Sequence, residues 1–388
     1  MGYLLALFFS IASPSLAVQT SSAPALASLE AELTRVVDLF YDLQFDAAMK
    51  AAEVITARYP GHPAGPFYRS IVYYQKFLVE EPKSKETLKL FERESQRAVD
   101  AGDGMMAANP AQAHYYLGAT HGFRARVLAA QKHYVKAVPE AMRSVRHVKD
   151  ALKIDPTLTD AYLGLGMYHY FTARMPKGAK PFAYLLGGSW GDREKGLEEL
   201  HKVADHGGPA RMEARSVLSV IYAMEAERNF DKSEAFLKEL MERYPHNPLY
   251  RLRRTYVAER RQAWSEAVAF ADCEGPWIAA LPSSLQSIAR NEARYRTAET
   301  YLLSGQPDKA EPLLNRLKDA KTSPSLAEWV LIRRGNLFDF RGQKDEAEAA
   351  YKQVKGKVAT RFAEQFLRER YPAGPKTAKP WTGVETPQ

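Results

Sequence analysis

A chain of 388 residues is larger than one compact core needs, so it contains several domains or an array of repeats. Hydrophobic residues make up 46% and charged residues 26%, which excludes a collagen-like or low-complexity chain. The single cysteine, Cys273, excludes an internal disulfide and a cysteine-based zinc site. The formal charge of +8 is spread over mixed-charge segments, so we predict no nucleic-acid partner.

The chain opens with a short apolar segment, residues 3–11, followed by small residues. The segment is too short to span a bilayer, and Ser15 and Ala17 are the small residues that a signal peptidase reads. No Lys or Arg precedes it, in contrast to a typical signal. We expect residues 1–17 to be a signal peptide and the protein to be exported to the periplasm, with a cytoplasmic location as the alternative.

From residue 29 to residue 371 the sequence predicts one helical domain. Apolar residues recur at spacings of three and four, as in Leu33, Val36 and Val37, and short breaks rich in Pro, Gly and Asn separate the segments. The break residues Pro209, Pro245 and Pro282 lie 36 and 37 residues apart, and earlier breaks are farther apart. Since each interval holds two helices, the period indicates a solenoid of helix pairs. Residues 372–388 read as a disordered tail.

Several units share one residue pattern. Two of them carry the spacings His114-x2-Leu117-Gly118-x2-His121 and Tyr162-x2-Leu165-Gly166-x2-His169, and a third carries Gly335, Phe338, Gly342, Ala347 and Tyr351. The chain thereby resembles the tetratricopeptide repeat family, although histidine twice stands where that family has tyrosine. The resemblance implies an all-α, right-handed superhelical solenoid of about seven antiparallel helix pairs. The small residues allow close crossing of paired helices.

The resemblance also implies a partner site, because in this family the first helix of each pair lines a concave groove. Aromatic residues there bind peptides through large contacts at a small entropy cost. The alternative is that these side chains pack between helices. The residues at the matching positions are Tyr115, Phe123, Leu163, Met167, Tyr170, Phe171, Tyr256, Arg260, Tyr295, Glu299, Trp329, Asn336 and Asp339.

A basic cluster falls on one predicted helix. It could bind an acidic peptide or an anionic lipid, or it could pair with neighbouring acids such as Glu259 and Glu266. The cluster consists of Arg251, Arg253, Arg254, Arg260 and Arg261, and Arg290, Arg294 and Arg296 follow on a later helix.

Patterns for catalysis or metal binding are weak. His114, His121 and His169 have no ligand spacing, so we predict no metal site and no cofactor. Cys273 has no histidine near it in sequence and reads as a small buried residue. The glycine-rich residues 177–191 lack the features of a phosphate-binding loop and read as an inserted loop that could contact a partner.

These observations favour a non-catalytic scaffold that holds a protein partner in its groove, in the cell envelope. The alternative is a binding module for a non-protein ligand, such as an anionic lipid or a glycan, in the periplasm. A third hypothesis is an enzyme site on the 177–191 loop. We also expect residues 359–370 to form a final helix with a polar outer face, which such arrays need at their ends.

Overall fold

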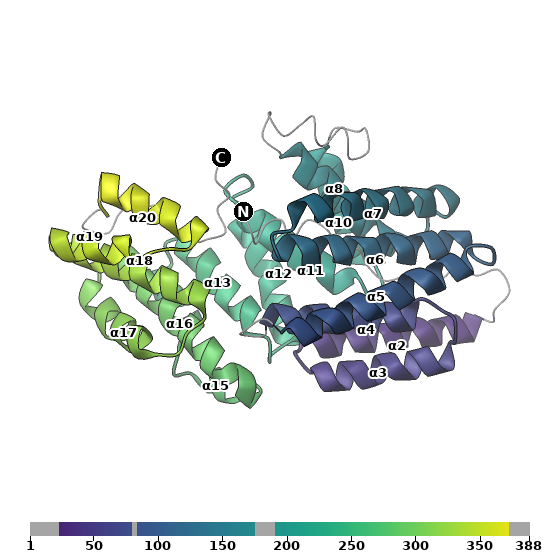
Figure 1. Cartoon of the computed structure of the whole chain (residues 1–388), viewed down its shortest axis with the longest axis horizontal. Coiled ribbons are helices and arrows are strands. Elements are labelled where there is room, and N and C mark those ends of the chain that lie inside the picture. The colour runs from purple at the N-terminus through teal and green to yellow at the C-terminus, as the bar shows by residue number, and fades with distance from the viewer. Residues whose placement is uncertain (1–22, 80–83, 175–190, 372–388) are drawn as a thin grey trace. The chain divides into compact units, whose positions relative to one another are not determined.

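The computed structural model describes residues 23–79, 84–174 and 191–371, and its elements are labelled in Figure 1. Over these ranges the chain is all-α, in consecutive helix pairs, with no strand among the residues described. The fold class predicted from the sequence is therefore confirmed. The predicted signal peptide, the predicted tail and nearly all of the glycine-rich loop lie outside the described residues.

Contacts between Cα atoms divide the chain into two compact units, with the boundary between Val220 and Ile221. Unit 1 holds four packed helix pairs (Figure 1). They are α2 (Ala23–Tyr41) with α3 (Phe45–Arg58), α4 (Ala64–Val79) with α5 (Lys85–Met105), α6 (Pro110–Ala130) with α7 (Tyr134–Ile154), and α8 (Tyr162–Ala173) with α10 (Arg193–His206), the short 3-10 helix η1 (Thr159–Ala161) preceding α8.

Helix α11 (Arg211–Ala223) crosses the boundary, and its last turn contacts α12 through stacked rings of Tyr222 and Phe236. Three further pairs and a final helix complete unit 2. Its elements are α12 (Phe230–Arg243), α13 (Pro248–Arg260), α14 (Trp264–Phe270), the short α15 (Pro276–Ala279), α16 (Ser283–Leu303), α17 (Pro307–Asp319), α18 (Pro324–Phe340), α19 (Lys344–Lys352) and α20 (Lys357–Glu369).

Helices start at the predicted breaks because the residues there stabilise a helix N-terminus. The side chain of Asn109 accepts a hydrogen bond from the backbone N–H of Gln112, 3.2 Å away, and Pro110 opens α6 where no intrahelical donor is needed. Ser323 and Pro324 open α18 in the same way. Capping by a polar side chain followed by proline therefore sets where these helices start.

Glycines let paired helices approach closely, as predicted from their positions in the pattern. A Cβ at Gly118 on α6 would lie 3.1 Å from the backbone nitrogen of Val148 on α7. A Cβ at Gly166 on α8 would lie 3.0 Å from the carbonyl oxygen of Gly196 on α10. Because neither backbone neighbour can move freely, a larger residue would push the pair apart.

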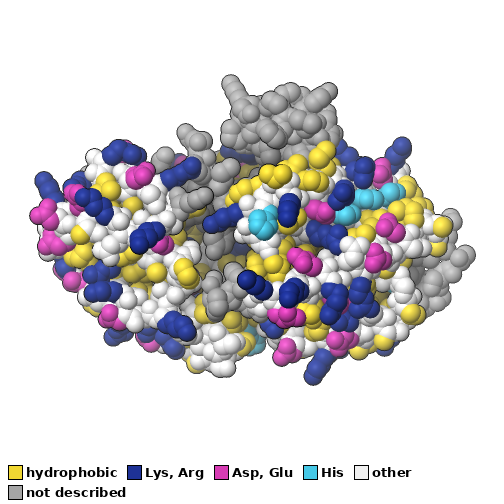
Figure 2. All heavy atoms as spheres, viewed as in Figure 1, with side chains coloured by type: hydrophobic (Ala, Val, Ile, Leu, Met, Phe, Trp, Pro, Cys, Tyr) yellow, Lys and Arg dark blue, Asp and Glu magenta, His cyan; other side chains and the backbone are white. Residues whose placement is uncertain are grey.

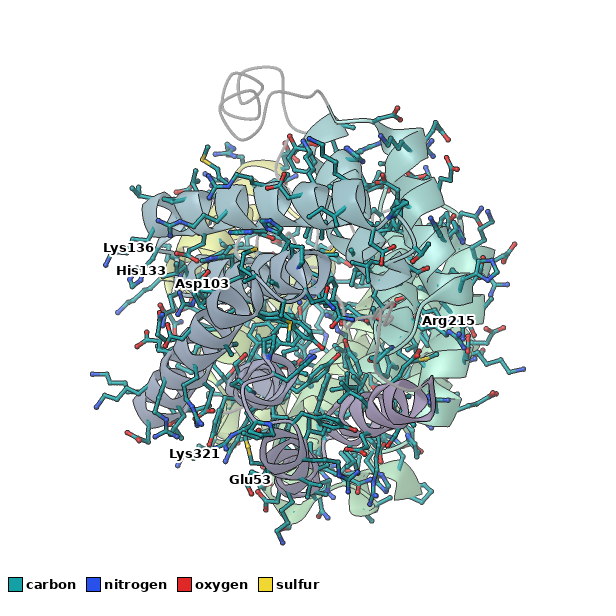
Figure 3. All side chains as sticks on the ribbon, turned by 90° about the vertical axis from the view of Figure 1, so that its right-hand side faces the viewer. Glu53, Asp103, His133, Lys136, Arg215 and Lys321 are labelled. Carbon is teal, nitrogen blue, oxygen red and sulfur yellow. The ribbon has the colours of Figure 1, made fainter. Side chains whose placement is uncertain are left out.

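The second helices expose charged side chains, and α7 also exposes apolar ones such as Val135, which is 88% exposed. In unit 1 the exposed side chains of Glu53 on α3 and Lys136 on α7 project away from the helix layers (Figure 3). None of the helices in the described ranges is long and apolar enough to cross a membrane. The last helix, α20, buries Ala359 and Ala363 against the core and exposes its charged residues, which confirms the predicted capping helix.

Candidate functional site

Most of the residues assigned to a partner groove are buried. Those of unit 1 are Tyr115, Phe123, Leu163, Met167, Tyr170 and Phe171, all at most 5% exposed. Phe123 packs edge-on against Phe67 and Tyr74 from the preceding pair. Helices α6 and α8 are covered on nearly every side, so these side chains form the core and do not line an open surface. For these six residues the structure corrects the assignment to an exposed groove and agrees with the packing alternative.

In unit 2 three of the assigned residues of α16 and α18 join one polar network. It links the first helices of three pairs, and its members are Glu259 on α13, Arg296 and Glu299 on α16, Arg333, Asn336 and Asp339 on α18, and Tyr351 on α19; we call it the α13–α16–α18 network. Tyr295 is buried beside it. Glu299, Asn336 and Asp339 are among the residues predicted to contact a partner, whereas Glu259 and Arg333 are not.

Glu299 is the centre of the network. Arg333 pairs with its Oε1, and Arg296 donates to its Oε2 over 2.8 Å. Burial is the largest single influence on the pKa of Arg333 and would lower it, but Glu299 together with the neighbouring Tyr295 and Tyr371 raises the pKa overall. Both arginines are therefore charged, and the buried carboxylate is fully paired. Such pairs fix a geometry more than they add stability.

Glu259 is the uncompensated member. Its Oε1 accepts a hydrogen bond of 2.6 Å from the Thr300 hydroxyl, whereas no described group hydrogen-bonds its Oε2. Burial and the neighbouring Glu299 carboxylate raise the pKa of Glu259 well above its usual range. This carboxyl therefore holds its proton to higher pH than an exposed glutamate does, and it presents a buried polar group toward the rest of the network.

Hydrogen bonds continue along α18 to the end of the described chain. Arg333 donates to Asn336 over 2.8 Å, Asn336 donates to the Tyr351 hydroxyl over 2.9 Å, and that hydroxyl donates to Asp339 Oδ2 over 2.8 Å. The same Asp339 oxygen accepts the backbone N–H of Tyr371, 3.0 Å away. The network therefore runs unbroken from Glu299 to Tyr371.

The chain folds back onto the network directly after α20. Arg370 has a positive φ of 53°, which ends the helix and redirects the chain. Its guanidinium lies 3.5 Å from Asp339 and 3.8 Å from Glu348. The Tyr371 ring packs edge-on against Phe366, and burial raises the pKa of its hydroxyl to about 12, against the opposing effect of Arg333. A two-residue segment of protein chain is thus bound at this face.

The remaining assigned residues of unit 2 are partly buried. Trp329 packs on Phe362 with ring centroids 5.9 Å apart, and Tyr256 is half-buried. Arg260 pairs with Glu225 and lies over the Phe230 ring. The assignment of Tyr256 and Trp329 to partner contact stays a prediction.

The basic cluster on α13 is occupied by partners within unit 2. Arg254 pairs with Glu234 and stacks on Phe270, and Arg261 lies 4.0 Å from Asp231. Arg251 lies over the Trp277 ring and Arg253 over the Tyr250 ring. On the face shown in Figure 2, basic side chains alternate with acidic ones. Ion pairing, the second of the two interpretations, describes this cluster.

Two of the histidines pair with carboxylates, and His121 also stacks on His147. His121 and His169, which share a repeat position, lie 2.7 Å from Glu140 and 2.6 Å from Glu199. His114 shares a hydrogen bond of 2.9 Å with His147. In the part of the chain that the structure describes, no group of three or more His, Cys, Asp or Glu residues is arranged to hold a metal ion. Cys273 is buried, and burial raises the pKa of its thiol.

Comparison with known proteins gives likeness only at the level of helix arrangement. No protein-family model and no curated protein matches the sequence. A tetratricopeptide repeat protein from Parabacteroides merdae is similar at 13% identity and a TM-score of 0.44, over 77% of this chain and 99% of that one. Yeast Tom70 is similar at 12% identity and 0.42, over 89% and 83%. Naa15/Naa10 bound to HypK-THB is similar at 13% and 0.32, over 88% and 78%.

Proposed function

We propose that this protein is a non-catalytic scaffold that holds a protein partner, and that unit 2 binds a peptide segment of that partner at the α13–α16–α18 network. The observation that carries the proposal is the bound segment Arg370–Tyr371. Asp339 accepts its main-chain N–H, a contact that any residue except proline can offer, and faces its basic side chain. Main-chain capture combined with side-chain selection is the usual basis of peptide recognition.

The chemistry of the network supports binding over catalysis. Glu299 is held by two arginines and Asp339 by a tyrosine hydroxyl, and Glu259 accepts a hydrogen bond from a threonine hydroxyl. A hydrolytic site needs a nucleophile activated by a free base, whereas Glu299 and Asp339 both accept hydrogen bonds from fixed partners within the network. These groups are fixed in direction before any ligand arrives, which lowers the entropy cost of binding.

Location in the cell envelope is the second part of the proposal. It rests on the apolar residues 3–11 and the small residues Ser15 and Ala17. Mass spectrometry of the protein purified from its own cells would give its amino-terminal residue. A chain that starts at Val18 supports export, and a chain that starts at Met1 contradicts it.

The binding proposal is tested by peptide display against the full chain. We expect peptides that wild type captures to lose at least about tenfold in affinity on Asp339→Asn, because a hydrogen bond to a charged acceptor contributes about 1.5–3 kcal/mol. The matched control is Asp308→Asn, which removes an aspartate of the same unit whose side chain is 89% exposed. Because Asp339 also holds Arg370–Tyr371, the deciding comparison is made in chains that carry Tyr371→Ala: if Asp339→Asn leaves the affinities unchanged in that background, this network is not the peptide site.

A further inference from the structure

We propose that Arg370–Tyr371 is an internal competitor for the peptide site of unit 2, and that the partner segment carries the same pair of residues in the same order, a basic residue followed by an aromatic one. This inference rests on the proposed function and goes beyond it. It specifies the chemistry of the partner, and it states that the site is occupied by the protein's own chain until a partner displaces it.

The basic position is defined by two carboxylates. The Arg370 guanidinium lies 3.5 Å from Asp339 Oδ1 and 3.8 Å from Glu348 Oε2, which come from α18 and α19. Its side chain is 36% exposed, so water reaches the pair and the contact is exchangeable. A lysine or arginine of another chain could approach the same two carboxylates from solvent. An acidic residue at this position would be repelled by both.

The aromatic position is half apolar and half polar. The Tyr371 ring is only 8% exposed and lies edge-on to Phe366, with centroids 5.7 Å apart. Its hydroxyl is close enough to Arg333, Glu299 and Glu259 for their charges to act on its pKa. The unpaired Oε2 of Glu259 provides a further polar atom on that side. A ring with a polar tip fits this environment best, so tyrosine is preferred over an aliphatic residue.

The internal segment binds weakly enough for another chain to displace it. Arg370 combines a φ of 53° with a ψ of 146°, a backbone conformation that costs a residue other than glycine about 1–3 kcal/mol. Two residues contact the site, and a covalently tethered ligand competes at an effective concentration in the millimolar range. A weak internal ligand of this kind lowers the apparent affinity of every partner and excludes those that lack the full motif.

The first test uses a probe peptide that copies residues 368–375 (RERYPAGP), labelled for fluorescence anisotropy, with the full chain. We expect Tyr371→Ala to bind the probe at least tenfold more tightly than wild type, because the internal competitor is weakened. The double variant Tyr371→Ala/Asp339→Asn should lose this gain. Tyr134→Ala, a tyrosine exposed on α7 in unit 1, is the matched control and should bind as wild type does. A probe with the central order reversed (REYRPAGP) should bind poorly.

A second measurement needs no substitution. In wild type the Tyr371 amide donates to Asp339, so saturating probe should speed its hydrogen exchange as the internal segment is displaced. Equal affinity of wild type and Tyr371→Ala, or unchanged exchange at this amide with the probe bound, overturns the inference. If other displayed peptides still depend on Asp339 while this probe does not bind, the proposed function stands and the inference alone fails.

Discussion

At the scale of single residues, Asp160 of unit 1 is a carboxyl group in a strongly perturbed environment. It lies in η1, fully buried, and accepts the backbone N–H of Gly208 over 2.8 Å and of Ala210 over 3.3 Å. Burial raises its pKa to about 8, and the two hydrogen bonds only partly oppose that effect. The folded protein therefore keeps a proton on Asp160 at pH values where the unfolded chain has lost it.

This proton makes stability depend on pH. Between about pH 4 and pH 8 the native state binds more protons than the unfolded state, so the free energy of unfolding falls as pH rises. The slope from this one group is at most about 1.4 kcal/mol per pH unit. Asp160→Asn should remove that contribution, as seen in urea unfolding at pH 5, 6, 7 and 8. Asp155→Asn, in the turn just before it, should keep the wild-type slope. Parallel slopes for wild type and Asp160→Asn would refute the assignment.

At the scale of helices, two successive helix pairs each contain a His–Glu contact that joins the first helix of the pair to the second. His121 on α6 contacts Glu140 on α7, and His169 on α8 contacts Glu199 on α10. His169 and Glu199 are both buried, at 6% each. In the resembled family an aromatic fills this position, whereas here an imidazole fills the space and also satisfies a carboxylate. The pair thus replaces an apolar contact by a directional one.

Removing one partner should cost more than removing both. His169→Ala leaves the Glu199 carboxylate buried without its donor, so we expect a loss of about 1–3 kcal/mol in the free energy of unfolding. His169→Ala/Glu199→Ala should lose less than the sum of the single variants, with a coupling of about 0.5–3 kcal/mol. Urea unfolding of the four proteins completes the cycle. Strict additivity would show that the pair contributes nothing beyond its packing.

The helix pairs could be predicted from the sequence because their signals are local. Capping residues such as Asn109, prolines such as Pro110 and the close-contact glycines Gly118 and Gly166 act within one helix or between neighbours. Burial of the first helices could not be predicted in the same way. A residue such as Tyr170 lies on a helix that is buried on nearly all sides, so its repeat position does not reveal which face meets solvent.

The candidate site depends on partners that are distant in sequence. Arg333 reaches Glu299 across 34 residues, and Thr300 reaches Glu259 across 41. Each of these charged residues reads as a surface residue when taken alone. A usable signal was present, since Arg333 follows the core residue Ile332 and Glu259 follows the core residue Ala258. A charged residue that directly follows a core residue on the first helix of a pair is a sequence signal for a buried polar network of this kind.

At the scale of the whole molecule, the chain is two compact units joined through α11. In an array of repeats each helix pair contacts its neighbours, so the effect of a substitution stays local. The tryptophans allow the units to be followed separately. The tryptophans of the described ranges are Trp264, Trp277 and Trp329, and all three lie in unit 2. In a Trp190→Phe/Trp381→Phe background, tryptophan fluorescence therefore reports on unit 2 and far-ultraviolet circular dichroism on both units.

Two glycine variants are each expected to destabilise one of the two units. A Cβ at Gly335 would lie 2.3 Å from the ring of Tyr351, which its hydrogen bonds to Asn336 and Asp339 hold in place. Gly335→Ala should therefore destabilise unit 2 by about 1–3 kcal/mol and lower the fluorescence midpoint in urea. A Cβ at Gly118 would lie 2.8 Å from Val148 Cγ2 in unit 1.

Gly118→Ala should lower the dichroism midpoint and leave the fluorescence midpoint in place. Gly104→Ala is the control, because nothing lies within 4 Å of the added Cβ and alanine favours a helix. Separate midpoints in the two variants mean that each unit unfolds by itself, so a partner that binds one unit stabilises only that unit. A single transition that both variants move equally would mean that α11 couples the units into one cooperative fold.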